Sequence, residues 1–247
     1  MKKGLNIVIS LVISMILLSS ISVTAFLQEK DKSPIRKPYK EKRFYPDEEL
    51  EKIQFIHFKE HKAKVPKQNT CYKLLGVKWK TFPVDYVINP SNPQGLSDLF
   101  LTSMISASAE TWDSATSTEL FNDIYDIDTT AKYGVQNFEN AIVFGDYPDS
   151  GVIAVTSIWY TRFTRQIVEF DMLLNTDFIW GDATLNSSVM DLKNIVVHEL
   201  GHSVGLGDIY ISSCSAVTMF GYSDYGETSK QTLETPDITG LQKMYGI

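Results

Sequence analysis

Residues 198–208 read HELGHSVGLGD and combine histidine, glutamate and aspartate at spacings that suit metal chemistry. On a helix, residues i and i+4 lie about 40° apart around the axis and roughly one turn along it, so His198 and His202 can reach one cation. Glu199 stands beside them as a candidate general base, and Asp208 offers a third ligand. Three ligands and one open position are typical of a catalytic zinc ion, which activates water for hydrolysis.

The preceding residues predict the helix that must position these side chains. Ser188, with Asp191 three residues later, resembles a capping box and predicts the helix start. Four apolar residues at helical spacing would form its buried stripe: Val189, Leu192, Val196 and Leu200. Gly205 stands where the helix should end. A glycine there can take positive φ and turn the chain so that Asp208 comes back towards the two histidines.

Two downstream segments extend the pattern. Residues 215–222 read SAVTMFGY, with Met219 near the centre, and residues 233–246 read LETPDITGLQKMYG. In this order and spacing they resemble the Met-turn and the closing helix of the matrixin catalytic domain. The chain is therefore similar to the matrixin-like metzincins over residues 198–246, and more loosely from Leu74 onwards.

This resemblance implies an α+β protein with the metzincin (zincin-like) fold: a mixed twisted β-sheet, an active-site helix, a Met-turn and a C-terminal helix. It implies a zinc-dependent endopeptidase that hydrolyses peptide bonds through a zinc-bound water, with Glu199 as general base. The implied zinc ligands are His198, His202 and Asp208. The commonest long motif has histidine at the third ligand position, and the aspartate here is similar instead to the snapalysin group.

Within this resemblance, Gly205 and Met219 give structural support to the site. The expected partner is a peptide or protein substrate, and we expect a monomer. A different class stays open, namely an exported or membrane-anchored metal-binding protein of the cell envelope with the same fold and little or no proteolytic activity. A casein or peptide-library assay with and without a chelator would separate the two.

Upstream patterns predict the rest of the fold. Strands are expected at 84–89, 141–144, 152–160 and 166–175, and a long helix from Ser97 through Trp112. The resemblance places the 152–160 strand at the sheet edge over the active-site cleft, where an extended peptide could pair with it. From the residues alone, an interior strand is an equally good interpretation.

The N-terminal residues predict export. Lys2 and Lys3 precede an apolar run, and small residues ending at Ala25 resemble a cleavage site, so residues 1–25 are read as a signal peptide of a secreted protein. The alternative is an uncleaved membrane anchor from Leu5 to Leu27, which is just long enough to span a bilayer.

Charge divides the remainder of the chain. Residues 26–70 hold 12 Lys/Arg against 8 Asp/Glu, whereas residues 71–247 hold 9 against 22. The first segment is interpreted as a basic prosegment or linker and the second as the catalytic domain. The prosegment could bind its own acidic catalytic domain and keep it latent, or be a solvated spacer. His57 and His61 are expected on a solvated helical face of this segment.

The chain has only two cysteines, Cys71 and Cys214, and both follow the export signal. In an oxidising compartment they predict one disulfide. The alternative is that the Cys71 thiolate blocks the zinc, as in the matrixin cysteine switch, although the switch motif is absent around it.

The acidic catalytic half argues against nucleic-acid binding, because no basic cluster would neutralise phosphates. Zn²⁺ is the expected catalytic ion. Four aspartates could also offer oxygen ligands to Ca²⁺, although their spacing matches no calcium-loop motif and predicts no specific site: Asp146, Asp149, Asp171 and Asp177.

Overall fold

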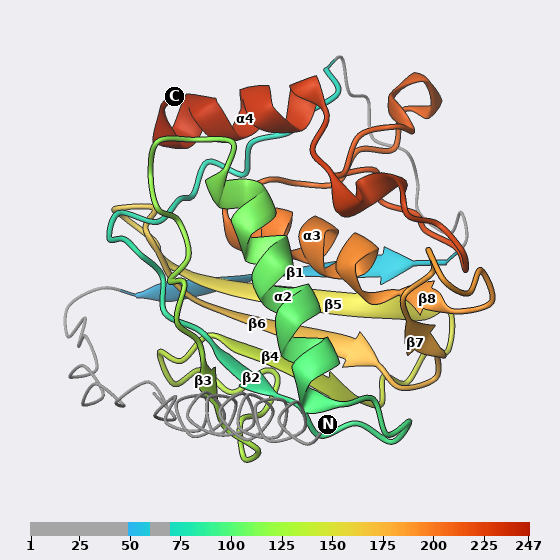
Figure 1. Ribbon diagram of the computed structural model, residues 1–247. Coiled ribbons are helices and arrows are strands. Elements are labelled where there is room, and N and C mark those ends of the chain that lie inside the picture. The colour runs from blue at the N-terminus through green and yellow to red at the C-terminus, as the bar shows by residue number, and fades with distance from the viewer. Residues whose placement is uncertain (1–48, 60–69) are drawn as a thin grey trace, which may run out of the picture. The chain divides into compact units, whose positions relative to one another are not determined.

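The computed structural model describes residues 49–59 and 70–247, all of which lie in one compact unit (Figure 1). The predicted signal peptide, its membrane-anchor alternative and His61 lie outside the described residues. Within the described part of the chain, no helix is long and apolar enough to cross a membrane.

A mixed six-stranded sheet forms the centre of this unit, in the order β1-β5-β6-β4-β2-β3. Its strands are β1 (Leu50–Phe58), β2 (Val87–Asn89), β3 (Asp126–Ile127), β4 (Ala141–Gly145), β5 (Val152–Thr161) and β6 (Ile167–Asn175). The β1–β5 and β5–β6 pairs are antiparallel and the other pairs are parallel. A second small sheet pairs β7 (Trp180–Gly181) with β8 (Met190–Asp191).

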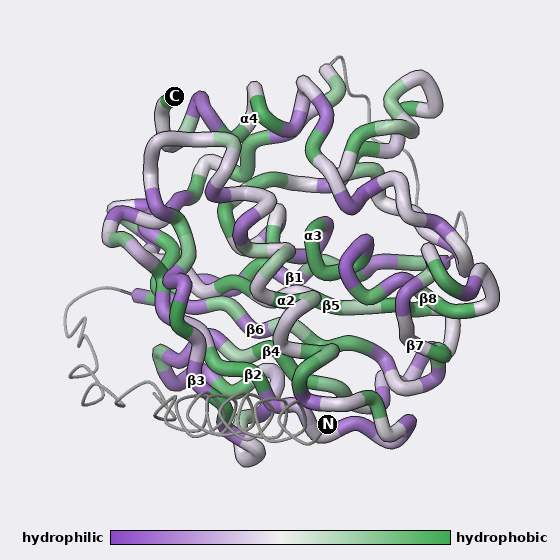
Figure 2. Tube along the Cα trace, viewed as in Figure 1, coloured by the Kyte–Doolittle hydropathy of each residue, from purple (hydrophilic) through white to green (hydrophobic). Residues whose placement is uncertain are grey.

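The predicted strands at 141–144, 152–160 and 166–175 are confirmed as β4, β5 and β6, whose apolar runs are buried on both faces of the sheet. Figure 2 shows these strands as largely hydrophobic tubes. Because side chains alternate along a strand, Met172 and Leu174 enter the core cluster on the helix side, while Leu173 enters a second cluster on the other face. Of the predicted 84–89 strand, only residues 87–89 form β2.

Two helices pack together on one face of the sheet (Figure 1). Helix α2 (Asp98–Asp113) begins as predicted, with the Ser97 hydroxyl accepting a hydrogen bond from the Phe100 amide at 3.3 Å. Its fully buried Trp112 donates from Nε1 to Val197 O of helix α3 at 2.8 Å. Helix α3 (Leu192–Ser203) carries the histidine motif and lies between the sheet and helix α4 (Thr235–Tyr245), which confirms the predicted C-terminal helix.

The predicted start of the motif helix is wrong. Met190 and Asp191 form strand β8, and the helix begins at Leu192 with Asp191 as its N-cap, whose Oδ1 accepts from the Asn194 amide at 2.7 Å. The other Asp191 oxygen accepts from Ala183 N, so the cap also holds the preceding loop. This tertiary hydrogen bonding outweighs the local Ser188 signal. The expected stripe is still buried, with Val189 contributing from just before the helix.

Strand β1 is a feature that the charge pattern did not predict. Residues 50–58 come from the basic segment, yet they pair with β5 along its whole length, from Leu50 opposite Thr161 to Phe58 opposite Val152. The solvated-spacer interpretation therefore fails for these nine residues. Of the two interpretations of β5, the interior strand is the one observed, and it is β1 that covers its edge.

Candidate metal centre

Helix α3 presents two of the predicted ligands, His198 and His202, on one face, and the loop after the helix brings the third, Asp208, next to them. His198 Nε2 and His202 Nε2 each lie 3.3 Å from Asp208 Oδ1. A ligand atom from each of these three residues lies within 4.8 Å of the other two. The sequence prediction therefore names three side chains that the fold does bring together.

Backbone carbonyls orient both imidazoles. His198 Nδ1 donates to Thr218 O at 2.7 Å, and His202 Nδ1 donates to Leu206 O at 2.9 Å. Because a carbonyl can only accept, each Nδ1 carries a hydrogen, and the neutral ring then has its lone pair on Nε2. Metal-ligating histidines are commonly fixed in this way.

The cluster fits a cation. Burial lowers the pKa of His198 to about 4, so its Nε2 carries a lone pair that faces the Asp208 carboxylate. This Nε2 is buried and has no hydrogen-bond partner among the described residues. Burial would raise the pKa of Asp208, but the two histidines hold it well below its usual value. Two nitrogen donors around a carboxylate are a borderline-soft set that suits Zn²⁺.

Gly205 makes the turn that returns Asp208 to the helix. Its φ of +102° lies in the region that favours glycine, and a Cβ there would collide with the Val77 carbonyl oxygen. The Gly205 amide donates to His202 O at 2.9 Å, and the next residue, Leu206, supplies the carbonyl that orients the His202 ring. One turn thus ends the helix and fixes two of the three potential ligands.

Met219 lies against the motif helix. A Cβ on Gly201 would collide with the Met219 sulfur, so the glycine in HELGH permits this close approach. Asp237, near the start of α4, accepts from Thr218 N at 2.9 Å and from Met219 N at 3.2 Å. The C-terminal helix therefore holds the turn whose Thr218 carbonyl orients His198.

Glu199 is fully buried, and burial raises its pKa. Its Oε2 accepts from the Thr156 hydroxyl of β5 at 2.5 Å, and its Oε1 is hydrogen-bonded to His57 Nδ1 at 3.0 Å. Sequence reasoning missed both partners. Thr156 is unremarkable within an apolar strand, and no local signal marks it as a neighbour of the motif.

The prediction that His57 lies on a solvated helical face is wrong. His57 is in strand β1, is 1 % exposed, and packs its ring 4.1 Å from that of His198. Two residues earlier, Phe55 stacks on the His202 ring at 4.0 Å with an interplanar angle of 8°. Phe55 and His57 occupy alternate positions and therefore point to the same face of the strand. The sequence LEKIQFIHF has no regular alternation of polar and apolar residues, so it did not mark this face.

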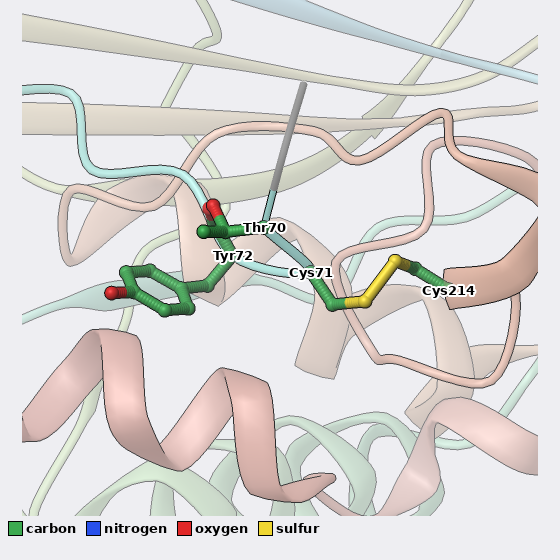
Figure 3. Close-up of a disulfide and its surroundings, with 4 residues drawn as sticks. All are labelled: Thr70, Cys71, Tyr72 and Cys214. Carbon is green, nitrogen blue, oxygen red and sulfur yellow. A yellow bond between two sulfur atoms is a disulfide. The ribbon is translucent and has the colours of Figure 1, made fainter.

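The predicted disulfide is present, and Figure 3 shows it between Cys71 and Cys214. Because Cys71 is bonded to Cys214, it has no free thiolate, and the alternative in which this thiolate binds the metal is wrong. The disulfide joins the N-terminal end of residues 70–247 to the loop that leads into the Met219 turn.

The segment after this turn is held by a buried lysine. Lys230 Nζ donates to Tyr222 O, to Ser223 Oγ at 2.8 Å and to Glu227, and the Lys230 amide donates to Asn194 Oδ1 of α3 at 2.7 Å. A surface pocket opens along the same segment, lined by Lys59, Ser215, Phe220, Tyr222, Ser223, Asp224 and Glu227. Residues 220–232, called the wall segment below, are thus held in place by Lys230 next to the cluster of His198, His202 and Asp208.

No calcium site emerges around the four aspartates. Within the described residues, none of them belongs to a group of three or more potential carboxylate, histidine or cysteine ligands. Asp171 is instead a buried group that accepts from Gly134 N at 2.6 Å and from Ala141 N at 3.3 Å.

The sheet, the motif helix, the Met219 turn and the C-terminal helix together define a metzincin fold. The family model of the matrixins matches residues 78–246, and the chain belongs to that family. It is 26% identical to matrix metalloproteinase-16 of Homo sapiens, and equally to that of Mus musculus, over 183 residues. That match covers 71% of this chain but only 28% of the relative. Metalloendoproteinase 1 of Glycine max is 41% identical over 69 residues, covering 27% of this chain and 21% of its own.

Proposed function

We propose that the protein is a zinc-dependent endopeptidase, with His198, His202 and Asp208 as the metal ligands and Glu199 as the general base. The observation that carries the proposal is the convergence of two imidazole Nε2 atoms on one carboxylate oxygen, 3.3 Å from each, beside a buried glutamate. Membership of the matrixin family supports the same reaction class.

When bound, zinc would polarise the scissile carbonyl and lower the pKa of the attacking water. The chain's own residues supply the proton transfers. Thr156 holds Glu199 Oε2, which leaves Oε1 as the atom that takes the proton from the water and returns it to the leaving amine. Because burial raises the pKa of Glu199, the carboxyl group can both accept and release this proton nearer neutral pH.

The substrate is expected to be an extended peptide. In place of β1, such a chain could add to β5 as a strand, with affinity from backbone hydrogen bonds and selectivity from pockets along residues 220–232. The Tyr222 region already forms a parallel bridge to Phe58, so a chain lying between β5 and this wall can reach both.

A peptide-library assay tests this function. Protein freed of residues before Cys71 should cleave the library, lose cleavage with a chelator and regain it with added Zn²⁺. The Glu199→Ala variant should bind zinc as tightly as the unchanged protein and cleave at least about 100-fold more slowly. Undiminished turnover by that variant would remove Glu199 from the base role.

Export is part of the same proposal. The lysine-led apolar start of the chain and the Cys71–Cys214 disulfide both suit a protein that leaves the cytoplasm. N-terminal sequencing of the protein recovered outside expressing cells should begin after Ala25. Recovery of the uncleaved chain in the membrane fraction would favour the anchored form.

A further inference from the structure

Strand β1 occupies the surface that an extended substrate would need. It runs antiparallel to β5 with a shift in register between His57 and Phe58, and the Lys59 amide continues the ladder with a hydrogen bond to Gly151 O at 3.0 Å. On its other side, Phe58 forms a parallel bridge to Tyr222. A second extended peptide cannot pair with β5 while β1 is there.

The side chains of β1 that face α3 lie on the catalytic groups themselves. Phe55 covers the His202 ring, and His57 contacts the His198 ring and hydrogen-bonds Glu199 Oε1. His198 and Glu199 are 0% exposed and His202 is 1% exposed. In this arrangement neither water nor a peptide bond can approach the base.

Lys59, the residue directly after β1, contacts the wall segment, residues 220–232. Lys59 Nζ lies 3.3 Å from Asp224 Oδ1 and 4.9 Å from the centre of the Tyr225 ring. Lys59 also lines the pocket formed by Phe220 and Tyr222. Residues 50–59 therefore cover the base and the edge of β5 and contribute to the lining of the pocket.

We propose that residues 50–58 are an intramolecular inhibitor that fills the substrate groove by strand addition, with His57 binding the general base Glu199. The proposal rests on the proposed function, since it concerns access to the same site. It differs from a thiol-based block because both cysteines are in a disulfide. It also differs from loose charge attraction, because the groups that make contact are a phenyl ring, an imidazole and a backbone ladder.

The position of the disulfide suits release of this strand. Cys71 is bonded to Cys214, so a cut between residues 59 and 70 frees β1 while the new chain end stays attached to the catalytic part. The strand is then held only by non-covalent contacts. A protease that cut the chain in this interval would therefore allow β1 to dissociate.

Strand binding can be measured without metal or catalysis. The full chain, folded with a protease recognition sequence placed within residues 60–69, would be cut, freed of β1 and kept metal-free. Its binding to a labelled peptide of residues 50–58 is then read by fluorescence anisotropy. The His57→Ala peptide should bind about 10- to 100-fold more weakly, because it leaves the buried Glu199 Oε1 without this hydrogen-bond partner.

The matched control is the Gln54→Ala peptide, since Gln54 is exposed on the opposite face of β1 and bonds only Tyr133 among the described side chains. It should bind within about 3-fold of the unchanged peptide. Equal affinity of the His57→Ala and Gln54→Ala peptides would overturn the role of His57. No binding of the unchanged peptide would overturn the whole proposal.

Hydrolysis separates this inference from the proposed function. Zinc-loaded cut protein should cleave the peptide library and the uncut chain should not. Equal cleavage by cut and uncut chains would contradict inhibition while supporting the protease. If the cut protein binds the strand peptide but cleaves nothing, strand addition stands and the protease proposal fails.

Discussion

Replacing Gly205 with alanine should damage both stability and metal binding, because the residue combines a positive φ with a close backbone neighbour. Its φ is +102°, and an added Cβ would collide with Val77 O. Gly95 offers a matched control: its φ is +69°, and a Cβ there would meet no atom within 4 Å. Both substitutions place a side chain at positive φ, and only Gly205→Ala adds the collision.

The expected magnitudes follow from these two contributions. Placing alanine in the left-handed region costs about 1–2 kcal/mol, which is the whole effect expected for Gly95→Ala. Overpacking against a fixed backbone atom adds about 1–3 kcal/mol, so Gly205→Ala should lower the free energy of unfolding by about 2–5 kcal/mol. Part of that cost should appear as movement of Leu206, whose carbonyl orients His202.

Urea unfolding of the two variants measures the free-energy difference, and competition with a zinc chelator measures metal affinity. Gly205→Ala should be the less stable variant and should bind zinc more weakly, while Gly95→Ala keeps its zinc affinity. The reasoning is refuted if Gly205→Ala is no less stable than Gly95→Ala, or if its zinc affinity is unchanged.

Three further predictions concern charge and covalent structure. Because aspartate brings a negative charge to the ligand set, Asp208→His should shift the pH–rate profile to lower pH, and an unshifted profile would contradict this. Burial raises the pKa of Asp171 to about 7. The folded state then binds the proton more tightly than the unfolded state, so the free energy of unfolding should fall as pH rises from about 4 to 7; Asp171→Asn should flatten this slope in urea titrations at each pH. Replacing Cys71 and Cys214 together by serine opens a loop with a sequence separation of 143 residues. This should cost up to about 5 kcal/mol by the chain-entropy model, measured by urea unfolding, and an unchanged midpoint would refute it.

The ligand set could be predicted from sequence because it is local. His198 and His202 share one helix face, and the turn at Gly205 returns Asp208 within six residues, so helix periodicity and one glycine suffice. The strands β4 to β6 were also predictable, since buried central strands are continuous apolar runs. The helix at 98–113 follows from its Ser97 cap and periodic apolar side chains.

The partners of Glu199 could not be predicted in this way. Thr156 and His57 reach it only through the register of β5 and β1, and register is set by long-range pairing rather than by neighbours in sequence. Strand β1 itself could not be predicted from its pattern either. Ile56 and Phe58 pack on one face while Phe55 and His57 pack on the other, so polar and apolar residues do not alternate along it. The average charge of residues 26–70 describes the segment and not these nine residues.

The most direct test of the metal centre is the zinc content of Asp208→Ala after exhaustive dialysis, compared with that of Glu199→Ala. Both substitutions remove a buried carboxylate next to the same two histidines, but only Asp208 is assigned as a ligand. We predict that Glu199→Ala retains equimolar zinc and that Asp208→Ala falls well below it. Equal metal-to-protein ratios in the two variants would contradict the three-ligand site.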